Sequence, residues 1–118
     1  MRALCSAMAS LLLVCSLGSS CSSEPAEPAS GATLFGQQCA MCHMRDGSGG
    51  ALGPTLHGKQ QYWTRASLVA YLKDPVGVAK QDPRLVAQGA KYSQAMPTYK
   101  MLPESALERL ADHVLALP

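Results

Sequence analysis

The chain has 118 residues, which leaves room for one folded domain. Its 10 Lys and Arg against 8 Asp and Glu give a formal net charge of +2. This near balance excludes the strongly basic surface of a nucleic-acid-binding domain. We therefore expect no nucleic-acid partner, and the composition leaves the class of partner open.

The first 20 residues have the layout of an export signal. Arg2 is followed by an apolar run from Ala7 to Val14, which is too short to span a bilayer. Small residues then precede Cys21 in an order that resembles the lipobox of bacterial lipoproteins, in which the cysteine is lipidated. A buried N-terminal helix and ordinary cleavage nearby are the alternatives. We expect the protein to be exported to the periplasmic side. There it is either tethered to the membrane by lipid on Cys21 or, if Cys21 is not lipidated, a soluble protein.

The stretch after Cys21 is polar and rich in proline over residues 22–30, which predicts an extended tether. The expected organisation is a signal peptide over 1–20, a lipid-attached linker over 21–30 and a folded domain over 31–118. Only Cys39 and Cys42 remain in that domain. Because an export compartment is oxidising, two free thiols would pair there unless they have another use.

The domain is expected to be all-α, with about four helices and long loops rich in Gly and Pro. The first predicted helix covers 31–43 and places Gly31, Phe35 and Cys39 on one face. The second covers 64–74, with Thr64 as its N-cap and Pro75 ending it.

Two more helices are expected toward the C-terminus. The first is short and covers 82–89, with Asp82 as N-cap and Gly89 as its stop. The other covers 103–117 and carries an apolar stripe of leucines, Ala111 and Val114. Because a domain this small buries only a modest core, we expect a large bound cofactor to stabilise the fold.

Cys39, Cys42 and His43 form a C-x-x-C-H motif, which is the attachment signature of c-type haem. Thiols one helical turn apart can join two vinyl groups on one side of a porphyrin, and the histidine then reaches the iron. A redox dithiol is the first alternative, but it favours a βαβ context, and the residues that flank the motif are expected to be helical without strands. A zinc site is the second, and it would need further ligands, for which only His57 and His113 remain.

A thioether opposite histidine raises the potential of a haem and fills its second axial position. Met96, followed by the stiffening Pro97, is the expected sulfur ligand. Met101 is the alternative ligand, and core packing is the ordinary role of methionine. Met41 and Met44 flank the motif and are not expected to reach the opposite face.

In this order the motif, the Met-Pro pair and the amphipathic last helix resemble class I cytochromes c of the small bacterial monohaem kind, over nearly all of 31–118. The resemblance implies that Gly31 and Phe35 pack across the last helix. It also implies that the Pro54 carbonyl, in the "GPTLHG" stretch, accepts a hydrogen bond from His43. Tyr62 and Trp63 fall where the family contacts a haem propionate, with core packing as the alternative.

The expected function is therefore single-electron transfer between respiratory or periplasmic redox partners by a monomer carrying one covalent haem c. No other catalytic motif is evident, so we expect a carrier and not an enzyme. Two alternatives keep the haem: an electron-transfer subunit of a larger redox enzyme, or a gas sensor or weak peroxidase with an open sixth position.

Overall fold

The computed structural model describes residues 26–118. The proposed signal, Cys21 and the first part of the tether lie outside the described residues. Within them the chain forms six α-helices and one short 3-10 helix, and no strand. The expectation of an all-α fold is confirmed, with more helices than the four that the sequence indicates.

The first helical region is divided at the first cysteine of the motif. Helix α1 spans Gly31–Gln38 and is capped by Ser30, whose Oγ accepts a hydrogen bond from Thr33 N at 3.1 Å. Helix α2 spans Ala40–His43. The sequence predicts one helix over 31–43, and in the structure this helix is interrupted at Cys39, which ends α1 and begins α2.

The middle of the chain holds η1, Lys59–Gln61, and then α3, Arg65–Lys73. Thr64 and Ser67 form a reciprocal capping box at the start of α3. A further helix that the sequence interpretation missed, α4, Pro75–Gln81, follows after one residue. Pro75 stops α3 and also starts α4, because proline is well suited to the first helical position.

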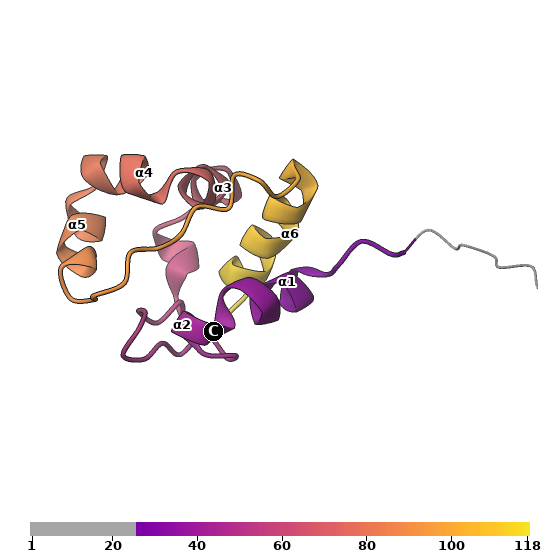
Figure 1. The fold of residues 1–118 in the computed structure, drawn as a ribbon, viewed down its shortest axis with the longest axis horizontal. Coiled ribbons are helices and arrows are strands. Elements are labelled where there is room, and N and C mark those ends of the chain that lie inside the picture. Colours follow the sequence, from indigo (N-terminus) through magenta and orange to yellow (C-terminus); the bar gives the residue numbers. More distant parts are fainter. Residues whose placement is uncertain (1–25) are drawn as a thin grey trace, which may run out of the picture.

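The last two helices lie close to their predicted positions. Helix α5 spans Pro83–Gly89 and is capped by Asp82, which accepts a hydrogen bond from Arg84 N at 2.9 Å. Helix α6 spans Glu104–Leu115. A long connection crosses from α5 to α6 over the middle of the molecule (Figure 1).

The core lies where α1 and α3 pack against α6. Leu107 and Leu110 of α6 are fully buried, and burial of each such side chain stabilises the fold by about 1.5–3 kcal/mol. The Phe35 ring lies 5.1 Å from the ring of His113, so the histidine packs across the helix interface. Gly31 lies directly against the backbone of Arg109 in α6, so the implied contact of Gly31 and Phe35 with the last helix is present.

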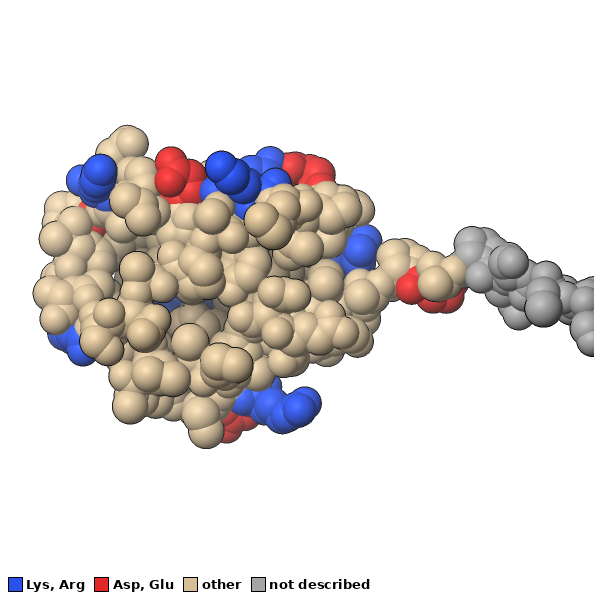
Figure 2. Space-filling view, viewed as in Figure 1, with Lys and Arg blue, Asp and Glu red and all other residues tan. Residues whose placement is uncertain are grey.

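Helices α4 and α5 lie at the other end of the molecule from α6 (Figure 1). Helix α5 buries no residue completely and packs mainly on α4. The face seen in Figure 2 is hollowed between these two ends of the molecule. Among residues 26–118, none of the helices has both the length and the apolar character needed to cross a membrane.

Candidate functional site

A cavity of about 540 Å³ opens inside this fold, a volume within the range of cofactor and small-molecule sites. It lies between α2 and the connection that leads to α6, with α3, α4 and α5 contributing to its walls. Four of the predicted site residues line it together: Cys39, Cys42, His43 and Met96. Segments more than 50 positions apart in the sequence therefore meet at one site.

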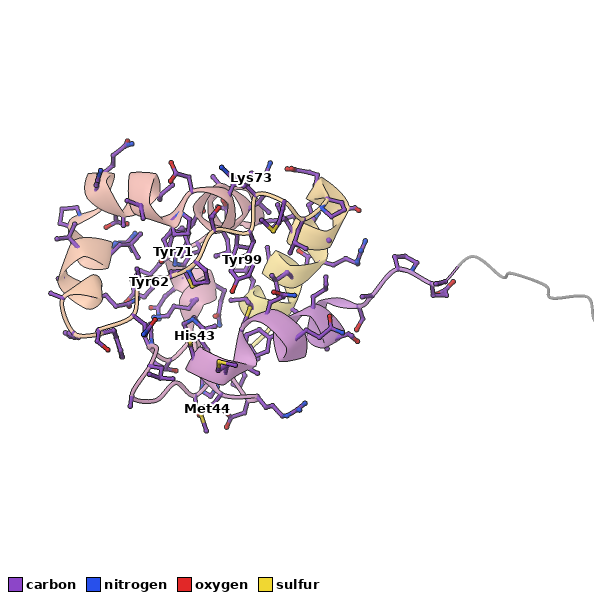
Figure 3. All side chains as sticks on the ribbon, in the orientation of Figure 1. His43, Met44, Tyr62, Tyr71, Lys73 and Tyr99 are labelled. Carbon is purple, nitrogen blue, oxygen red and sulfur yellow. The ribbon has the colours of Figure 1, made fainter. Side chains whose placement is uncertain are left out.

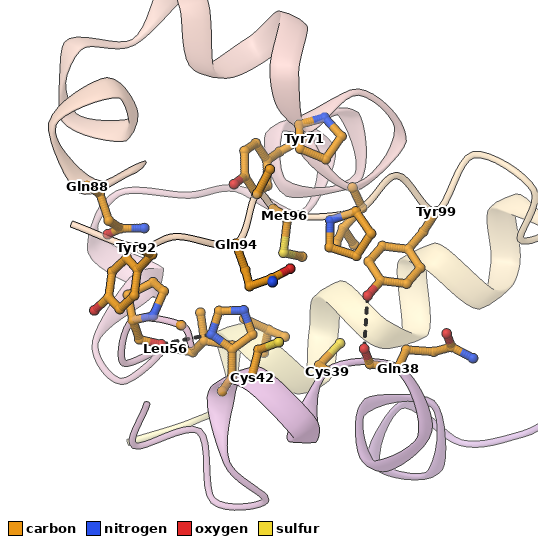
Figure 4. Close-up of a pocket in the computed structure, with 18 of the residues that line it drawn as sticks. Gln38, Cys39, Cys42, Leu56, Tyr71, Gln88, Tyr92, Gln94, Met96 and Tyr99 are labelled. Atoms are coloured by element: carbon orange, nitrogen blue, oxygen red, sulfur yellow. Dashed lines mark hydrogen bonds between the residues drawn. The ribbon is translucent and has the colours of Figure 1, made fainter. Parts of the chain in front are cut away.

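The two cysteines lie side by side on the wall that α2 forms (Figure 4). Cys39 is buried and Cys42 is half-buried, and both thiols are free. The Cys42 amide donates a hydrogen bond to the Cys39 carbonyl at 3.1 Å, which holds the residues about one turn apart. Burial, helped by the neighbouring Cys42, raises the pKa of the Cys39 thiol to about 11. Both sulfurs are thus placed to reach one edge of a bound ring.

His43 ends α2 and is buried, with 6% of its surface exposed. Its Nδ1 lies 2.8 Å from the carbonyl oxygen of Pro54. Because a carbonyl only accepts hydrogen bonds, Nδ1 must carry the proton. In the neutral ring the lone pair then lies on Nε2, the nitrogen that remains for a metal ion in the cavity. This is the hydrogen bond that the family resemblance implies for Pro54.

The loop that carries Pro54 must approach the histidine closely. A Cβ on Gly53 would lie 3.1 Å from His43 Nδ1 and 3.0 Å from the Cys42 carbonyl oxygen. His57 Nε2 donates a hydrogen bond to the Asp46 carbonyl at 2.7 Å and so closes the same loop. His57 therefore has a structural role in the loop.

Met96 reaches into the cavity from the connection between α5 and α6, across from the cysteines (Figure 4). Met101, the alternative ligand, is 81% exposed and is not among the residues that line the cavity. Met44 is exposed as well, and Met41 lies at the edge of the cavity with 85% of its surface exposed. Of the methionines in the described part of the chain, Met96 is the one whose side chain lies inside the cavity.

Three hydrogen bonds hold the segment just after Met96. Thr98 Oγ1 donates to the Lys73 carbonyl at 2.7 Å, and the Tyr99 amide donates to the Leu72 carbonyl at 2.8 Å. The buried Tyr99 hydroxyl donates to the Gln38 carbonyl at 2.9 Å. The segment is thereby tied to the end of α3 on one side and to the end of α1 on the other. Figure 3 labels Lys73 and Tyr99, and Figure 4 draws the hydrogen bond between Tyr99 and Gln38.

Tyr99→Phe should loosen this tie between the Met96 segment and the residue before Cys39. The change removes one hydrogen bond and leaves the Gln38 carbonyl unpaired, which we expect to lower the free energy of unfolding by about 1–2 kcal/mol. Burial, with a smaller contribution from the two cysteines, raises the pKa of Tyr99 to about 12, so the hydroxyl stays a donor at neutral pH. Urea unfolding of the holoprotein measures the effect, and Tyr62→Phe, at an exposed tyrosine, is the control. Equal stability of the two variants would show that the Tyr99 hydrogen bond does not stabilise the fold.

The two aromatic residues proposed for a propionate contact differ in position. Trp63 lines the main cavity, and its ring lies 5.1 Å from that of Tyr71, which also lines it. Tyr62 is 54% exposed and lies outside the main cavity, beneath the guanidinium of Arg84, which is 5.2 Å from its ring centre. Both aromatic residues border a smaller adjoining hollow. Trp63 is thus placed to face a ligand in the main cavity, whereas Tyr62 is not.

The sequence interpretation missed one side of the cavity. Leu85, Gln88, Gly89 and Tyr92 line it from α5 and the turn after it, at a spacing of three, four and seven residues. That spacing is typical of residues on one face of a helix, and it was the sequence signal by which these lining residues could have been found. Because this face meets the cavity and not a protein core, α5 has no fully buried residue.

The cytochrome c family model matches residues 28–118. The chain therefore belongs to the cytochrome c family. No match is found among curated proteins or among solved structures.

Members of this family carry covalently attached haem c, and one haem suits a domain of this size. The site fits that group by its own chemistry. Cys39 and Cys42 offer two adjacent thiols, and His43 offers its Nε2, since Nδ1 is hydrogen-bonded to the Pro54 carbonyl. Among residues 26–118, no three His, Cys, Asp or Glu side chains gather as a bare metal site would require.

Proposed function

We propose that the protein is a single-electron carrier whose haem iron is ligated by His43 and Met96. The observation that supports it most directly is that both residues line the cavity that Cys39 and Cys42 also line. Imidazole and thioether together fill both axial positions, which suits electron transfer and leaves no position for substrate. The haem supplies the one-electron chemistry, and the protein supplies its binding, orientation and electrostatic surroundings.

The residues of the chain have distinct roles in this proposal. Cys39 and Cys42 hold the ring through thioether bonds, and Pro54 fixes the His43 ring and keeps the proton on Nδ1. The tie through Tyr99 sets the position of the segment that carries Met96. Apolar side chains on α3 and α6, among them Leu68, limit the entry of water.

Visible spectra of the purified protein, oxidised and reduced, test the proposal. We expect the colour to stay with the polypeptide after denaturation, as thioether attachment requires. We also expect the oxidised protein to show the sulfur-to-iron charge-transfer band, and the reduced protein to resist carbon monoxide. Ready binding of carbon monoxide would favour a gas sensor or peroxidase instead. Purification in a stoichiometric, detergent-resistant complex would favour a subunit of a larger enzyme.

We further propose that the carrier is exported and tethered to a membrane by lipid on Cys21, so that it works as a monomer beside respiratory or periplasmic partners. The support comes from the sequence, because Cys21 lies outside the described residues. Cys21→Ser should move the protein from the membrane fraction to the soluble fraction. Cys15→Ser is the matched control and should leave the protein with the membranes. Retention of the Cys21 variant in the membrane fraction would refute the anchor.

A further inference from the structure

The backbone takes an unusual conformation directly after His43. Met44 has φ 64° and ψ 157°, and among the described residues other than glycine it alone has a positive φ. This region of the backbone map is populated almost only by glycine, because a Cβ there collides with neighbouring peptide atoms. The Met44 backbone is therefore strained. Strain of this kind persists where the surrounding structure imposes it, and it is found most often at functional sites.

Two backbone hydrogen bonds impose the turn at Met44. The Gly47 amide donates to the Met44 carbonyl at 3.1 Å, and the Gly49 amide donates to the His43 carbonyl at 2.9 Å. The chain is thereby folded back on the end of α2. Met44 itself is next to His43 in the chain but does not line the haem cavity, and its side chain is exposed (Figure 3).

The turn brings Gly49 against the residue that orients His43. A Cβ on Gly49 would lie 2.5 Å from the carbonyl carbon of Pro54 and would overlap the Thr55 nitrogen, so the two backbones are in direct contact. Gly49 thus touches His43 through one hydrogen bond and Pro54 through this packing. The position of the Pro54 oxygen, 2.8 Å from His43 Nδ1, therefore depends on the direction that the chain takes at Met44.

We propose that Met44 is a positioning residue, whose strained backbone directs the loop so that the Pro54 carbonyl meets His43 Nδ1. This inference deepens the proposed function and rests on it, because it assumes that His43 is bound to the haem iron. A hydrogen bond from Nδ1 to a carbonyl makes the imidazole a stronger electron donor to a metal. Stronger donation favours the oxidised iron, so this contact lowers the reduction potential.

The methionine side chain contributes to the same loop. Its Sδ lies 3.7 Å from the position that a Cβ would take on Gly50, so it packs over that glycine. Glycine at position 44 would adopt the turn without strain, but it would lack this contact and would leave the loop more mobile. A test must therefore separate the effect of the backbone from that of the side chain.

The strain is tested by comparing Met44→Gly with Met44→Ala. Both variants lack the methionine side chain, and they differ in the Cβ that makes this conformation unfavourable. Where φ is negative, glycine is the less stable of the two, because it loses more conformational freedom on folding. At Met44 we expect the reverse order, with a higher urea midpoint for the Met44→Gly holoprotein than for Met44→Ala.

Met101 is the matched control for this comparison. It is also an exposed methionine, and its φ is not positive. Met101→Ala should therefore unfold at a higher urea concentration than Met101→Gly. If alanine were the more stable residue at both positions, Met44 would not be strained and the proposal would be overturned.

A second comparison measures the effect on His43. Met44→Val keeps an apolar side chain, but its branched Cβ is the least compatible with this conformation. Exchange of the His43 Nδ1 proton with water is followed by NMR of the reduced holoprotein. We expect it to be faster by about tenfold or more in Met44→Val, as loss of one hydrogen bond implies, and the reduction potential to rise. Met44→Gly should retain slow exchange and a potential close to that of the wild type.

The contrast between valine and glycine separates positioning from stability alone. A residue that only stabilised the fold would change the urea midpoint without changing the His43 proton or the potential. Unchanged exchange and an unchanged potential in Met44→Val would therefore overturn the positioning role.

Gly49→Ala tests the same path if Met44→Val does not fold. The added Cβ overlaps the backbone at Pro54, so it should displace the Pro54 carbonyl and give the same faster exchange and higher potential. Gly50→Ala is the matched control, because its Cβ would meet only the end of the Met44 side chain, and it should change neither value. Normal exchange in Gly49→Ala would overturn the proposal.

Failure of the proposed function has a different signature. In that case the wild-type protein would lack covalent haem or the sulfur-to-iron charge-transfer band. The comparison of glycine with alanine at Met44 does not depend on how the iron is ligated, so the two failures are distinguishable.

Discussion

Met96→Ala is expected to lower the reduction potential of the haem and to open its sixth position while leaving the haem attached. Thioether ligation favours the reduced iron, and the identity of the axial ligands sets haem potentials over about 0.8 V. We expect the drop to be a sizeable part of that range. Attachment should persist because Cys39 and Cys42 are not changed and lie on the opposite wall of the cavity.

A redox titration measures the potential of this variant, and carbon monoxide or imidazole binding reports the open position. The sulfur-to-iron charge-transfer band should be lost in the same variant. Met101→Ala is the matched control, because this side chain is exposed and lies outside the cavity. An unchanged potential in Met96→Ala, or a drop in Met101→Ala instead, would show that Met96 is not the ligand.

The parts of the fold that follow local rules could be predicted from the sequence. Thr64 and Asp82 cap helices where their hydroxyl and carboxylate oxygens can accept from the first turn, and both helices begin there. Helix α4 was missed because Pro75 was interpreted only as a stop. With Asp74 before it as N-cap, the same proline opens a new helix.

The site residues that belong to one sequence motif could be predicted. The site residues that are positioned by tertiary packing could be predicted less well. Cys39, Cys42 and His43 are adjacent in the sequence, so their shared wall follows from helical geometry. Tyr62 and Trp63 are neighbours as well, yet only Trp63 faces the main cavity. The orientation of that pair depends on how η1 packs, which local sequence does not determine. The Tyr99 hydrogen bond spans 61 residues and is equally beyond local rules.

The close approach of α1 to α6 depends on the absence of a side chain at Gly31. A Cβ at this position would overlap the backbone carbonyl of Arg109 and lie 2.9 Å from the Cβ of His113. Backbone atoms cannot move aside as the end of a flexible side chain can, so the two helices would have to separate. Gly31→Ala is therefore expected to lower the free energy of unfolding by about 1–3 kcal/mol, the usual cost of overpacking.

Gly36→Ala is the control within the same helix. A Cβ at Gly36 would meet only the end of the Arg45 side chain, at 3.9 Å. Alanine is favoured over glycine in a helix interior, so this variant should be as stable as the wild type or more stable by up to about 1 kcal/mol. Urea unfolding of the holoproteins, followed by far-UV circular dichroism, gives both values. Since the two substitutions are chemically identical, equal stabilities would mean that α1 and α6 are not in close contact at Gly31.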